Sequence, residues 1–251
     1  MIEFVGAGPG AVDLITVRGQ RIIESADIII YAGSLVNKEI LSYSKDGAKV
    51  YNSASMTLDE VVDVMIDGYK KGLKVARVHT GDPSIYGAIK EQMDRLDSEG
   101  IEYRVTPGVS SLFAAAASLN VEYTLPSVSQ TVIITRAEGR TPVPEGEGIK
   151  SLSSHNATMA IFLSTGLLEN VEKDLISGGY SPDTKAAIVY KASWEDEKKF
   201  LCTVSTLYKT AKENNITKTA LILVGDFLEG EYELSKLYDP SFTHEYRRAS
   251  R

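Results

Sequence analysis

Two short loops hold the residues whose types and spacing are best suited to chemistry. Residues 6–11 read GAGPGA and residues 79–87 read HTGDPSIYG, and each follows a predicted strand. Glycine lets a backbone approach a ligand closely, proline stiffens a loop, and the Asp82 carboxylate suits a cation or a hydroxyl. Ligands of open α/β sheets bind at the carboxyl ends of strands, where both loops are expected. An isolated aspartate here has a second interpretation, as the N-cap of the next helix.

The first loop can be tested as a dinucleotide site. Such a site needs glycines after the first strand, a helix N-terminus, and an acidic residue at the end of the second strand. The predicted second strand, residues 27–32, has its only acid, Asp27, at its beginning. Pro9 also fixes φ and removes an amide hydrogen where a phosphate needs a donor. The sequence therefore disfavours a dinucleotide site, and a strand-to-helix turn without any ligand is an equal alternative for this stretch alone.

Composition narrows the classes of partner. The 251 residues carry a formal net charge of −7, which argues against a nucleic-acid groove. No apolar run is long enough to span a bilayer, and the first residues lack the pattern of a signal peptide. The single cysteine, Cys202, and three widely separated histidines give no metal-ligand cluster. We therefore expect a cytoplasmic protein without a nucleic-acid partner, a membrane partner or an enzyme-bound metal.

Strands and helices alternate in the first half, which predicts a parallel α/β sheet with right-handed crossovers. Asp13 is a candidate N-cap for the first helix, and Thr57 with Glu60 forms a capping-box pattern before the second. Residues 27–32 (DIIIYA) are apolar at every position after Asp27, which is typical of a strand inside a parallel sheet. Strands are expected at residues 2–5, 27–32, 49–52, 73–79 and 102–105, and helices at residues 13–25, 57–72, 85–99 and 110–119.

The sequence pattern changes near residues 120–130, which lack helical periodicity and contain a proline. We place a domain boundary there, giving α/β domains at residues 1–120 and 121–251. The second half predicts strands at 131–135, 158–163, 185–190, 198–204 and 219–224, with helices at 167–177 and 205–214. Residues 136–149 form a long segment rich in glycine, proline and charge, and such a segment is more often functional or mobile than idle.

Three motifs occur in order, each after a predicted strand: GAGPGAVDLIT, TGDPSIYG and TPGVSSLFAAAA. As a set they resemble the tetrapyrrole methylase family, whose members transfer a methyl group from S-adenosylmethionine to porphyrinoid or related substrates. The resemblance spans nearly the whole chain. Residues 31–37 (YAGSLVN) and 135–144 (TRAEGRTPVP) resemble the members that act on precorrins. The resemblance implies a homodimer of two dissimilar α/β domains with a ligand cleft between them, where the glycine turn forms a wall of the substrate cleft.

The resemblance also implies roles for individual residues. Asp82 would offset the positive charge of the methyl donor, and Thr165, where many relatives have methionine, would contact it through backbone only. For Thr165 and Ala192, strand-end packing is an equally good explanation. Arg136 and Arg140 would bind substrate carboxylates, with exposed loop charge as the alternative. The implied donor contacts are Pro9, Thr80, Gly81, Asp82, Ile85, Ser110, Ser111, Thr165 and Ala192.

The implied reaction is an in-line displacement in which an electron-rich ring carbon of the substrate attacks the sulfonium methyl group. The enzyme would align the reactants and exclude water. Tyr31, His79 and Tyr86 lie near the expected loops, but nothing in the sequence singles out a catalytic base. Alternatives are methylases of other precorrin carbons, of uroporphyrinogen, of diphthine precursors or of RNA ribose, and a non-catalytic nucleotide-binding module.

Overall fold

The computed structural model describes residues 1–249, and the chain divides into two units. The first contains Met1–Ala115 together with Lys191–Glu197, and the second contains the residues from Ala116 to Tyr190 and from Lys198 onward. The division falls inside helix α4 (Ser111–Leu119), whereas the sequence placed it after this helix. The excursion of residues 191–197 into the first unit was not expected from the sequence.

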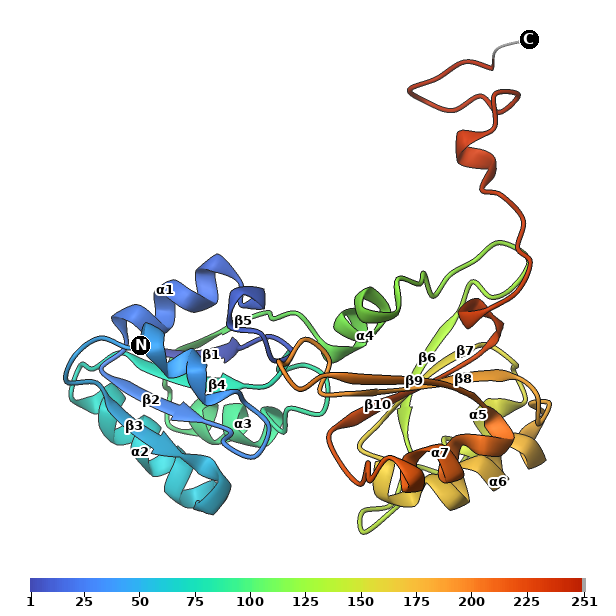
Figure 1. The fold of residues 1–251 in the computed structure, drawn as a ribbon. Helices are drawn as coiled ribbons and strands as arrows, with labels where there is room; N and C mark the ends of the chain where they lie inside the picture. The colour runs from blue at the N-terminus through green and yellow to red at the C-terminus, as the bar shows by residue number, and fades with distance from the viewer. Residues whose placement is uncertain (250–251) are drawn as a thin grey trace. The chain divides into compact units, whose positions relative to one another are not determined.

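The first unit is built on a five-stranded sheet in which every pairing is parallel, as predicted (Figure 1). Its strands are β1 (Ile2–Gly6), β2 (Ile28–Tyr31), β3 (Lys49–Asn52), β4 (Val75–His79) and β5 (Tyr103–Thr106), in the order β3-β2-β4-β1-β5. Strand β2 is buried on both faces: Ile28 and Ile30 pack in one apolar core, while Ile29 and Tyr31 pack in the other. Its continuous apolar run is therefore explained by two covered faces.

Helix α1 (Val17–Ser25) begins later than the sequence predicted. Residues 12–14 form a separate 3-10 turn, and Thr16 is the N-cap of α1, with its side chain accepting a hydrogen bond from the Gly19 amide. The prediction of Asp13 as N-cap was wrong. Helix α2 (Leu58–Lys70) has the predicted capping box: Thr57 Oγ1 accepts from the Glu60 amide at 3.3 Å, and Glu60 Oε2 accepts from the Thr57 amide at 2.7 Å.

Helix α3 (Lys90–Ser98) is also shorter than predicted, since residues 85–89 form a loop instead of its first turn. Tyr86 has φ 55° and Ala88 has φ 49°, in the left-handed region that a right-handed helix excludes. The helical periodicity of the sequence does not reveal these two dihedrals. The consequence is a constrained loop next to Asp82.

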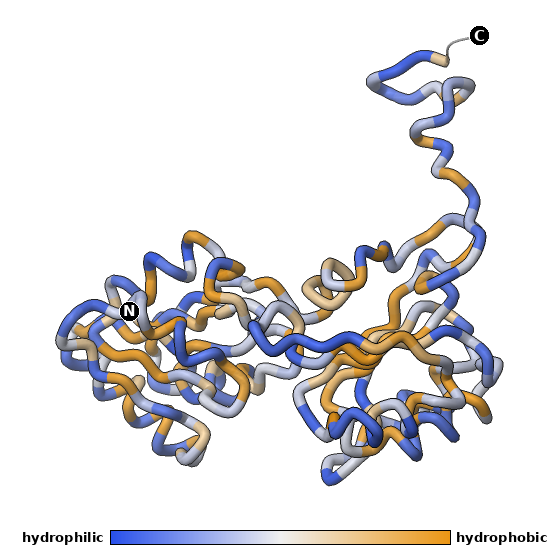
Figure 2. The backbone as a smooth tube through the Cα atoms, in the orientation of Figure 1, coloured by the Kyte–Doolittle hydropathy of each residue, from blue (hydrophilic) through white to orange (hydrophobic). Residues whose placement is uncertain are grey.

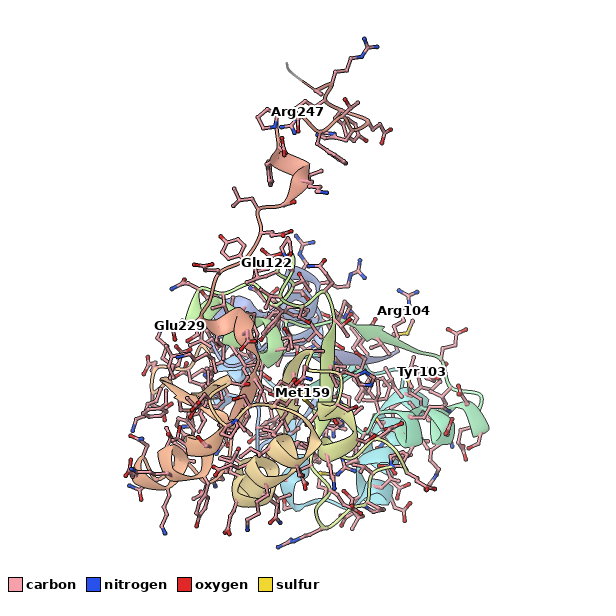
Figure 3. The ribbon with its side chains drawn as sticks, turned by 90° about the vertical axis from the view of Figure 1, so that its right-hand side faces the viewer. Tyr103, Arg104, Glu122, Met159, Glu229 and Arg247 are labelled. Carbon is pink, nitrogen blue, oxygen red and sulfur yellow. The ribbon has the colours of Figure 1, made fainter. Side chains whose placement is uncertain are left out.

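The second unit has a mixed five-stranded sheet. Its strands are β6 (Val132–Arg136), β7 (Thr158–Phe162), β8 (Lys185–Tyr190), β9 (Lys198–Thr203) and β10 (Ala220–Val224), in the order β6-β7-β10-β8-β9. Only the β6–β7 pairing is parallel. Helices α6 (Leu168–Gly178) and α7 (Leu207–Glu213) contribute to one apolar core with the strands, together with α5 (Ile149–Ser153), which was not predicted. Met159 lies within this core (Figure 3), and the strands carry the apolar residues seen in Figure 2.

The described part of the C-terminal tail has local structure of its own. Residues 236–238 form a 3-10 turn, and the Arg247 guanidinium donates to the carbonyl oxygens of Leu237 at 2.9 Å and Asp239 at 2.6 Å. Arg247 and Glu229, near the two ends of the tail, are labelled in Figure 3. Within residues 1–249, no helix combines the length and apolar character that crossing a membrane requires.

Candidate functional site

Three loops meet at the carboxyl edge of the first unit's sheet, and glycine makes the meeting possible. The loops follow β1, β4 and β5, which are adjacent in the sheet. The Gly81 amide donates to the Gly8 carbonyl at 2.7 Å, and the Gly8 amide donates to the Gly81 carbonyl at 3.3 Å. A Cβ on Gly108 would lie 2.1 Å from the Gly81 oxygen, and one on Gly6 would lie 2.5 Å from the Gly108 nitrogen. Any side chain at Gly6 or Gly108 would force these backbones apart.

Asp82 joins two of these loops. One carboxylate oxygen accepts from the Gly108 amide at 2.9 Å, and the other accepts from the Ser84 amide at 2.8 Å and from Ser84 Oγ at 2.5 Å. Partial burial raises the pKa of the carboxyl, but the hydrogen bonds from Ser84 and Gly108 outweigh it, so the pKa lies below its ordinary value of 3.8. Asp82 is therefore a carboxylate anion at neutral pH.

The alternative interpretation of Asp82, as a helix cap, is wrong. Helix α3 begins at Lys90, its N-cap residue is Ile89, and no side chain caps it. A carboxylate has about four acceptor sites, so the three observed hydrogen bonds leave Asp82 with capacity for a ligand. Its predicted contact with the positive charge of a methyl donor is compatible with this geometry and stays a prediction.

The other predicted residues of the first unit lie on the same loops. Thr80 and Ile85 are half-buried beside Asp82. Ser110 is buried, and its Oγ accepts from the Leu112 amide at 3.2 Å at the start of α4, where Ser111 is the first helical residue. A Cβ on Gly81 would lie 3.5 Å from Ser110 Cα. The structure therefore brings the TGDPSIYG and TPGVSS motifs into one cluster.

The glycine turn has few free amide donors for a phosphate. The Ala7 amide donates to the His79 carbonyl at 2.8 Å, and the Ala11 amide donates to Ser193 Oγ at 3.0 Å. Pro9 has no amide hydrogen, and the Gly8 amide is bonded to Gly81. This geometry agrees with the sequence in disfavouring a dinucleotide site. Ala192, which is 5% exposed, belongs to the segment that packs on this turn.

Buried polar groups lie directly behind the second loop. The Arg77 side chain donates to Gln92 Oε1 at 3.0 Å and to the Ile30 carbonyl at 3.3 Å. Burial, with a further contribution from the Arg77 charge, lowers the pKa of His79 to about 3. Among the three residues near the site that were considered as a base, His79 and Tyr31 are buried and Tyr86 is 45% exposed. His79 is therefore poorly suited to accept a proton from a substrate.

The remaining predicted residues lie in the second unit. Thr165 is buried, and its Oγ1 donates to the Ala220 carbonyl at 3.3 Å, as expected of strand-end packing. The Arg136 guanidinium donates to the carbonyl oxygens of Thr141 at 3.2 Å and Pro142 at 2.7 Å, so it holds its own loop together. Arg140 is exposed in that loop. Arg140 is thus the better placed of the two arginines for a carboxylate ligand.

The sequence did not single out two side chains that contact the glycine turn of the candidate site. Trp194 Nε1 donates to the Pro9 carbonyl at 2.9 Å, and Asn37 Nδ2 donates to the Gly10 carbonyl at 3.0 Å. Asn37 lies in the quoted YAGSLVN stretch and Trp194 is the single tryptophan of the sequence, so a signal was present, but neither pattern indicates the partner.

A surface hollow of about 550 Å³ lies at the opposite edge of the same sheet, where the strands begin. None of the predicted residues lines it, and it is not at the edge where open α/β sheets bind ligands. Its lining includes the neighbours Tyr103 and Arg104 (Figure 3), and Tyr103 Oη donates to Asp97 at 3.2 Å. Within the described residues 1–249, no three His, Cys, Asp or Glu side chains form a group that could hold a metal ion.

Residues 1–208 match the family model of the Tetrapyrrole (Corrin/Porphyrin) Methylases. The chain belongs to this family. Among curated proteins, it is 56% identical over 249 residues to the cobalt-precorrin-4 C(11)-methyltransferase of Methanocaldococcus jannaschii, covering 99% of this chain and 96% of the relative. It is 48% identical to the enzyme of the same name from Priestia megaterium (98% and 97% covered) and 43% identical to the precorrin-4 C(11)-methyltransferase of Pseudomonas aeruginosa (98% of each).

Solved structures show the same fold. The X-ray structure of a cobalt precorrin-4 methyltransferase superposes with a TM-score of 0.89 at 48% identity, covering 91% of this chain and 96% of that one. A uroporphyrin-III C-methyltransferase from Thermus thermophilus, solved with S-adenosylhomocysteine, superposes with a TM-score of 0.74 at 22% identity, covering 91% and 93%. The predicted fold of two dissimilar α/β domains is confirmed as the tetrapyrrole methylase fold.

Proposed function

We propose that this protein transfers a methyl group from S-adenosylmethionine to carbon C11 of precorrin-4 in cobalamin biosynthesis, with the cobalt-containing ring as its preferred substrate. The observation that carries the proposal is 56% identity over essentially the full length of a cobalt-precorrin-4 C(11)-methyltransferase. The preference for cobalt rests on the order of similarity, since the precorrin-4 enzyme of Pseudomonas aeruginosa is 43% identical.

The carboxyl edge of the first unit's sheet fits a methyl donor of this kind. The donor, when bound, supplies a methyl group on a positively charged sulfur atom. Gly81 and Gly108 present backbone without side chains, and the anionic Asp82 offers charge complementary to an ammonium or sulfonium group. We propose that Thr80, Gly81, Asp82, Ile85 and the Ser110–Ser111 pair bind and orient the donor here. Pro9, Ala192 and Thr165 stay predicted contacts.

Arg140 is the proposed contact for the substrate. A precorrin carries many carboxylates, while this protein has a net charge of −7, so binding depends on local cations instead of the overall field. Guanidinium binds carboxylate through two parallel hydrogen bonds. Arg136 supports this role indirectly, because its hydrogen bonds to Thr141 and Pro142 hold the loop that carries Arg140.

The protein's part in the proposed reaction is alignment and exclusion of water. The substrate ring carbon is the nucleophile, so no side chain needs to form a covalent intermediate. Holding two reactants in attack geometry contributes roughly 7 to 11 kcal/mol toward the barrier. Neither His79 nor Tyr31 is assigned as a base, since both are buried and the pKa of His79 is lowered to about 3.

We further propose that the protein is a cytoplasmic homodimer that works without a resident metal, a nucleic-acid partner or a membrane. The family resemblance supports the homodimer, and the acidic composition with a single cysteine supports the remainder. Light scattering during size-exclusion chromatography tests the homodimer. A mass of twice 27.3 kDa is expected, and the monomer mass would contradict it.

The proposed function is tested by identifying the product. The protein is incubated with ¹³C-methyl S-adenosylmethionine and precorrin-4, with or without cobalt in the ring, and the product is analysed by mass spectrometry and NMR. We expect one added methyl group at C11 and faster transfer to the cobalt form. Methylation of another carbon, or of uroporphyrinogen III, would identify a different family activity. Donor binding without transfer to any tetrapyrrole would support a non-catalytic module.

A further inference from the structure

The segment Lys191–Glu197 is fastened to the glycine turn by side chains that the sequence did not single out. Trp194 Nε1 donates to the Pro9 carbonyl at 2.9 Å, and Ser193 Oγ accepts from the Ala11 amide at 3.0 Å. These two hydrogen bonds join residues that are more than 180 positions apart in the chain, at separations of 185 and 182. The segment belongs to the first unit, as these contacts with the glycine turn lead one to expect.

Gly10 shows how closely the indole lies on the turn. A Cβ on Gly10 would be 2.0 Å from Trp194 Cδ1 and 2.2 Å from Trp194 Nε1. Gly10 does not have a positive φ, so alanine can adopt its backbone conformation. The requirement for glycine at this position therefore comes from the indole and not from the dihedral angles.

The segment is held in a costly conformation, which indicates that its position is specified. Lys191 has φ 48° and Ser193 has φ 71°, both in the left-handed region. Lys191 Nζ lies 5.0 Å from the centre of the Trp194 ring and forms an ion pair with Asp196 at 2.6 Å. The Ser193 amide also donates to the Glu197 carboxylate at 2.5 Å. These contacts within the segment hold the indole in place independently of its contacts with the glycine turn.

We propose that Trp194 is a positioning residue for the methyl donor. The contacts of Ser193 and Trp194 with Pro9, Gly10 and Ala11 form an indole latch, which holds Ala192 and Pro9 in one fixed wall. Ala192 is two positions from Trp194 and buried, so its location follows that of the latch. This inference rests on the proposed function and on the predicted contacts of Pro9 and Ala192 with the donor. Loss of the latch loosens the wall and weakens donor binding without removing any group that touches the donor.

The first test compares two variants of Trp194 by calorimetry with S-adenosylhomocysteine. Trp194→Phe keeps an aromatic ring against Gly10 but loses the N–H group, and we expect the dissociation constant to rise about fivefold to tenfold, the size of one net hydrogen bond. Trp194→Ala should raise it further. Tyr208→Ala is the matched control, because Tyr208 is another aromatic residue with a lysine near its ring, Lys212 at 5.7 Å. It should bind like the wild type.

Steady-state kinetics separate positioning from general damage. In Trp194→Phe the KM for S-adenosylmethionine should rise by the same factor, while the KM for the tetrapyrrole stays unchanged. Equal increases in both KM values, or unchanged donor affinity in both Trp194 variants, would overturn the inference. If the wild type itself binds no S-adenosylhomocysteine, the proposed function fails, which is a distinguishable result.

A double-mutant cycle tests the contact itself without any ligand. Gly10→Ala should lower the melting temperature in the wild type, because its Cβ displaces the indole. In the Trp194→Ala background the same change should have little effect, since the obstructing atoms are gone. Additive effects of the two substitutions would contradict the latch. The fluorescence of the single tryptophan gives a direct readout, because Gly10→Ala should shift its emission to longer wavelength.

Discussion

Asp82→Ala removes the side chain that ties the β4 loop to the β5 loop, so we expect it to affect both stability and donor binding. The substitution leaves the amides of Gly108 and Ser84 without the carboxylate that accepts from them at 2.9 Å and 2.8 Å. It also removes an anion from the place where the positively charged donor is proposed to bind. The two effects have separate measurements.

The stability effect is estimated from the hydrogen bonds. A hydrogen bond to a charged group contributes about 1.5–3 kcal/mol when buried. Asp82 is only half-buried, and water can reach the exposed amides after truncation, so the three bonds together are expected to contribute about 2 kcal/mol, well below their sum. For a chain of this length that corresponds to a decrease of about 4–8 °C in melting temperature. Asp82→Asn should lie between wild type and alanine, since an amide accepts on one side only.

The assay is thermal unfolding of each variant, followed by calorimetry with S-adenosylhomocysteine below the melting temperature. Asp67→Ala is the matched control, because Asp67 is an exposed carboxylate whose Lys71 partner lies at 2.6 Å on the surface of α2. Removing a surface ion pair of this kind changes stability by at most about 1 kcal/mol. It should leave the affinity for S-adenosylhomocysteine unchanged.

The stability difference between wild type and Asp82→Ala should depend on pH, and the lowered pKa of Asp82 gives the direction of that dependence. The pKa of Asp82 is lowered in the folded protein, so the unfolded chain binds the proton more readily. The stability difference between wild type and Asp82→Ala should be present above pH 3.8 and should be lost as the pH falls through the lower folded value. If Asp82→Ala kept the wild-type melting temperature and the wild-type affinity for S-adenosylhomocysteine, two claims would be refuted: that the hydrogen bonds of Asp82 stabilise the two loops, and that Asp82 contacts the donor.

Three further outcomes are expected. Gly108→Ala should abolish donor binding and lower stability, because its Cβ would lie 2.1 Å from the Gly81 oxygen, whereas Gly148→Ala, with nothing within 4 Å, should behave as wild type in calorimetry and thermal unfolding. Arg140→Ala should raise the KM for the tetrapyrrole about tenfold or more and leave the affinity for S-adenosylhomocysteine unchanged; equal loss for both ligands would contradict its role. In denaturant titrations, His79→Phe should lose less free energy of unfolding than the wild type between pH 7 and pH 4. The reason is that the unfolded histidine takes up a proton near pH 6.5, while the folded one, with a pKa of about 3, does not. An unchanged dependence of the free energy of unfolding on pH would contradict this.

The parallel sheet of the first unit could be predicted because its strands carry an unusual pattern. A run such as residues 28–32, apolar at every position, is expected only where both faces are covered. The capping box of Thr57 and Glu60 was equally visible, because its two residues are three positions apart. These features depend on neighbours in the sequence.

The errors arose where the structure depends on distant contacts or on single dihedrals. Thr16 and not Asp13 caps α1, since residues 12–14 form a turn of their own. Tyr86 and Ala88 have left-handed φ values, and α3 begins at Lys90, later than the predicted residue 85. The indole latch joins residues more than 180 positions apart, so no local pattern could place Trp194 against Pro9.

The sequence predicted which loops form the candidate site, but not the hydrogen bonds that their side chains make. The motifs around Gly81 and Ser110 meet because the carboxyl ends of parallel strands share one edge, which the sequence pattern implied. The hydrogen bonds of Asp82 to another loop, and those of Arg136 to its own loop, depend on side-chain geometry that motifs do not encode. Arg136 is bonded to its own loop and Arg140 is exposed there, so Arg140 is the better placed of the two, and substrate binding by either arginine stays a prediction.

A crystal structure with bound S-adenosylhomocysteine tests the central claim most directly. The claim is that the methyl donor binds where the loops after β1, β4 and β5 meet. We predict contacts to the backbone of Gly81, to Asp82 and to the Ser110–Ser111 pair. Binding of the ligand at the start of the strands, in the hollow lined by Tyr103 and Arg104, or contacts to none of these loops, would contradict the account.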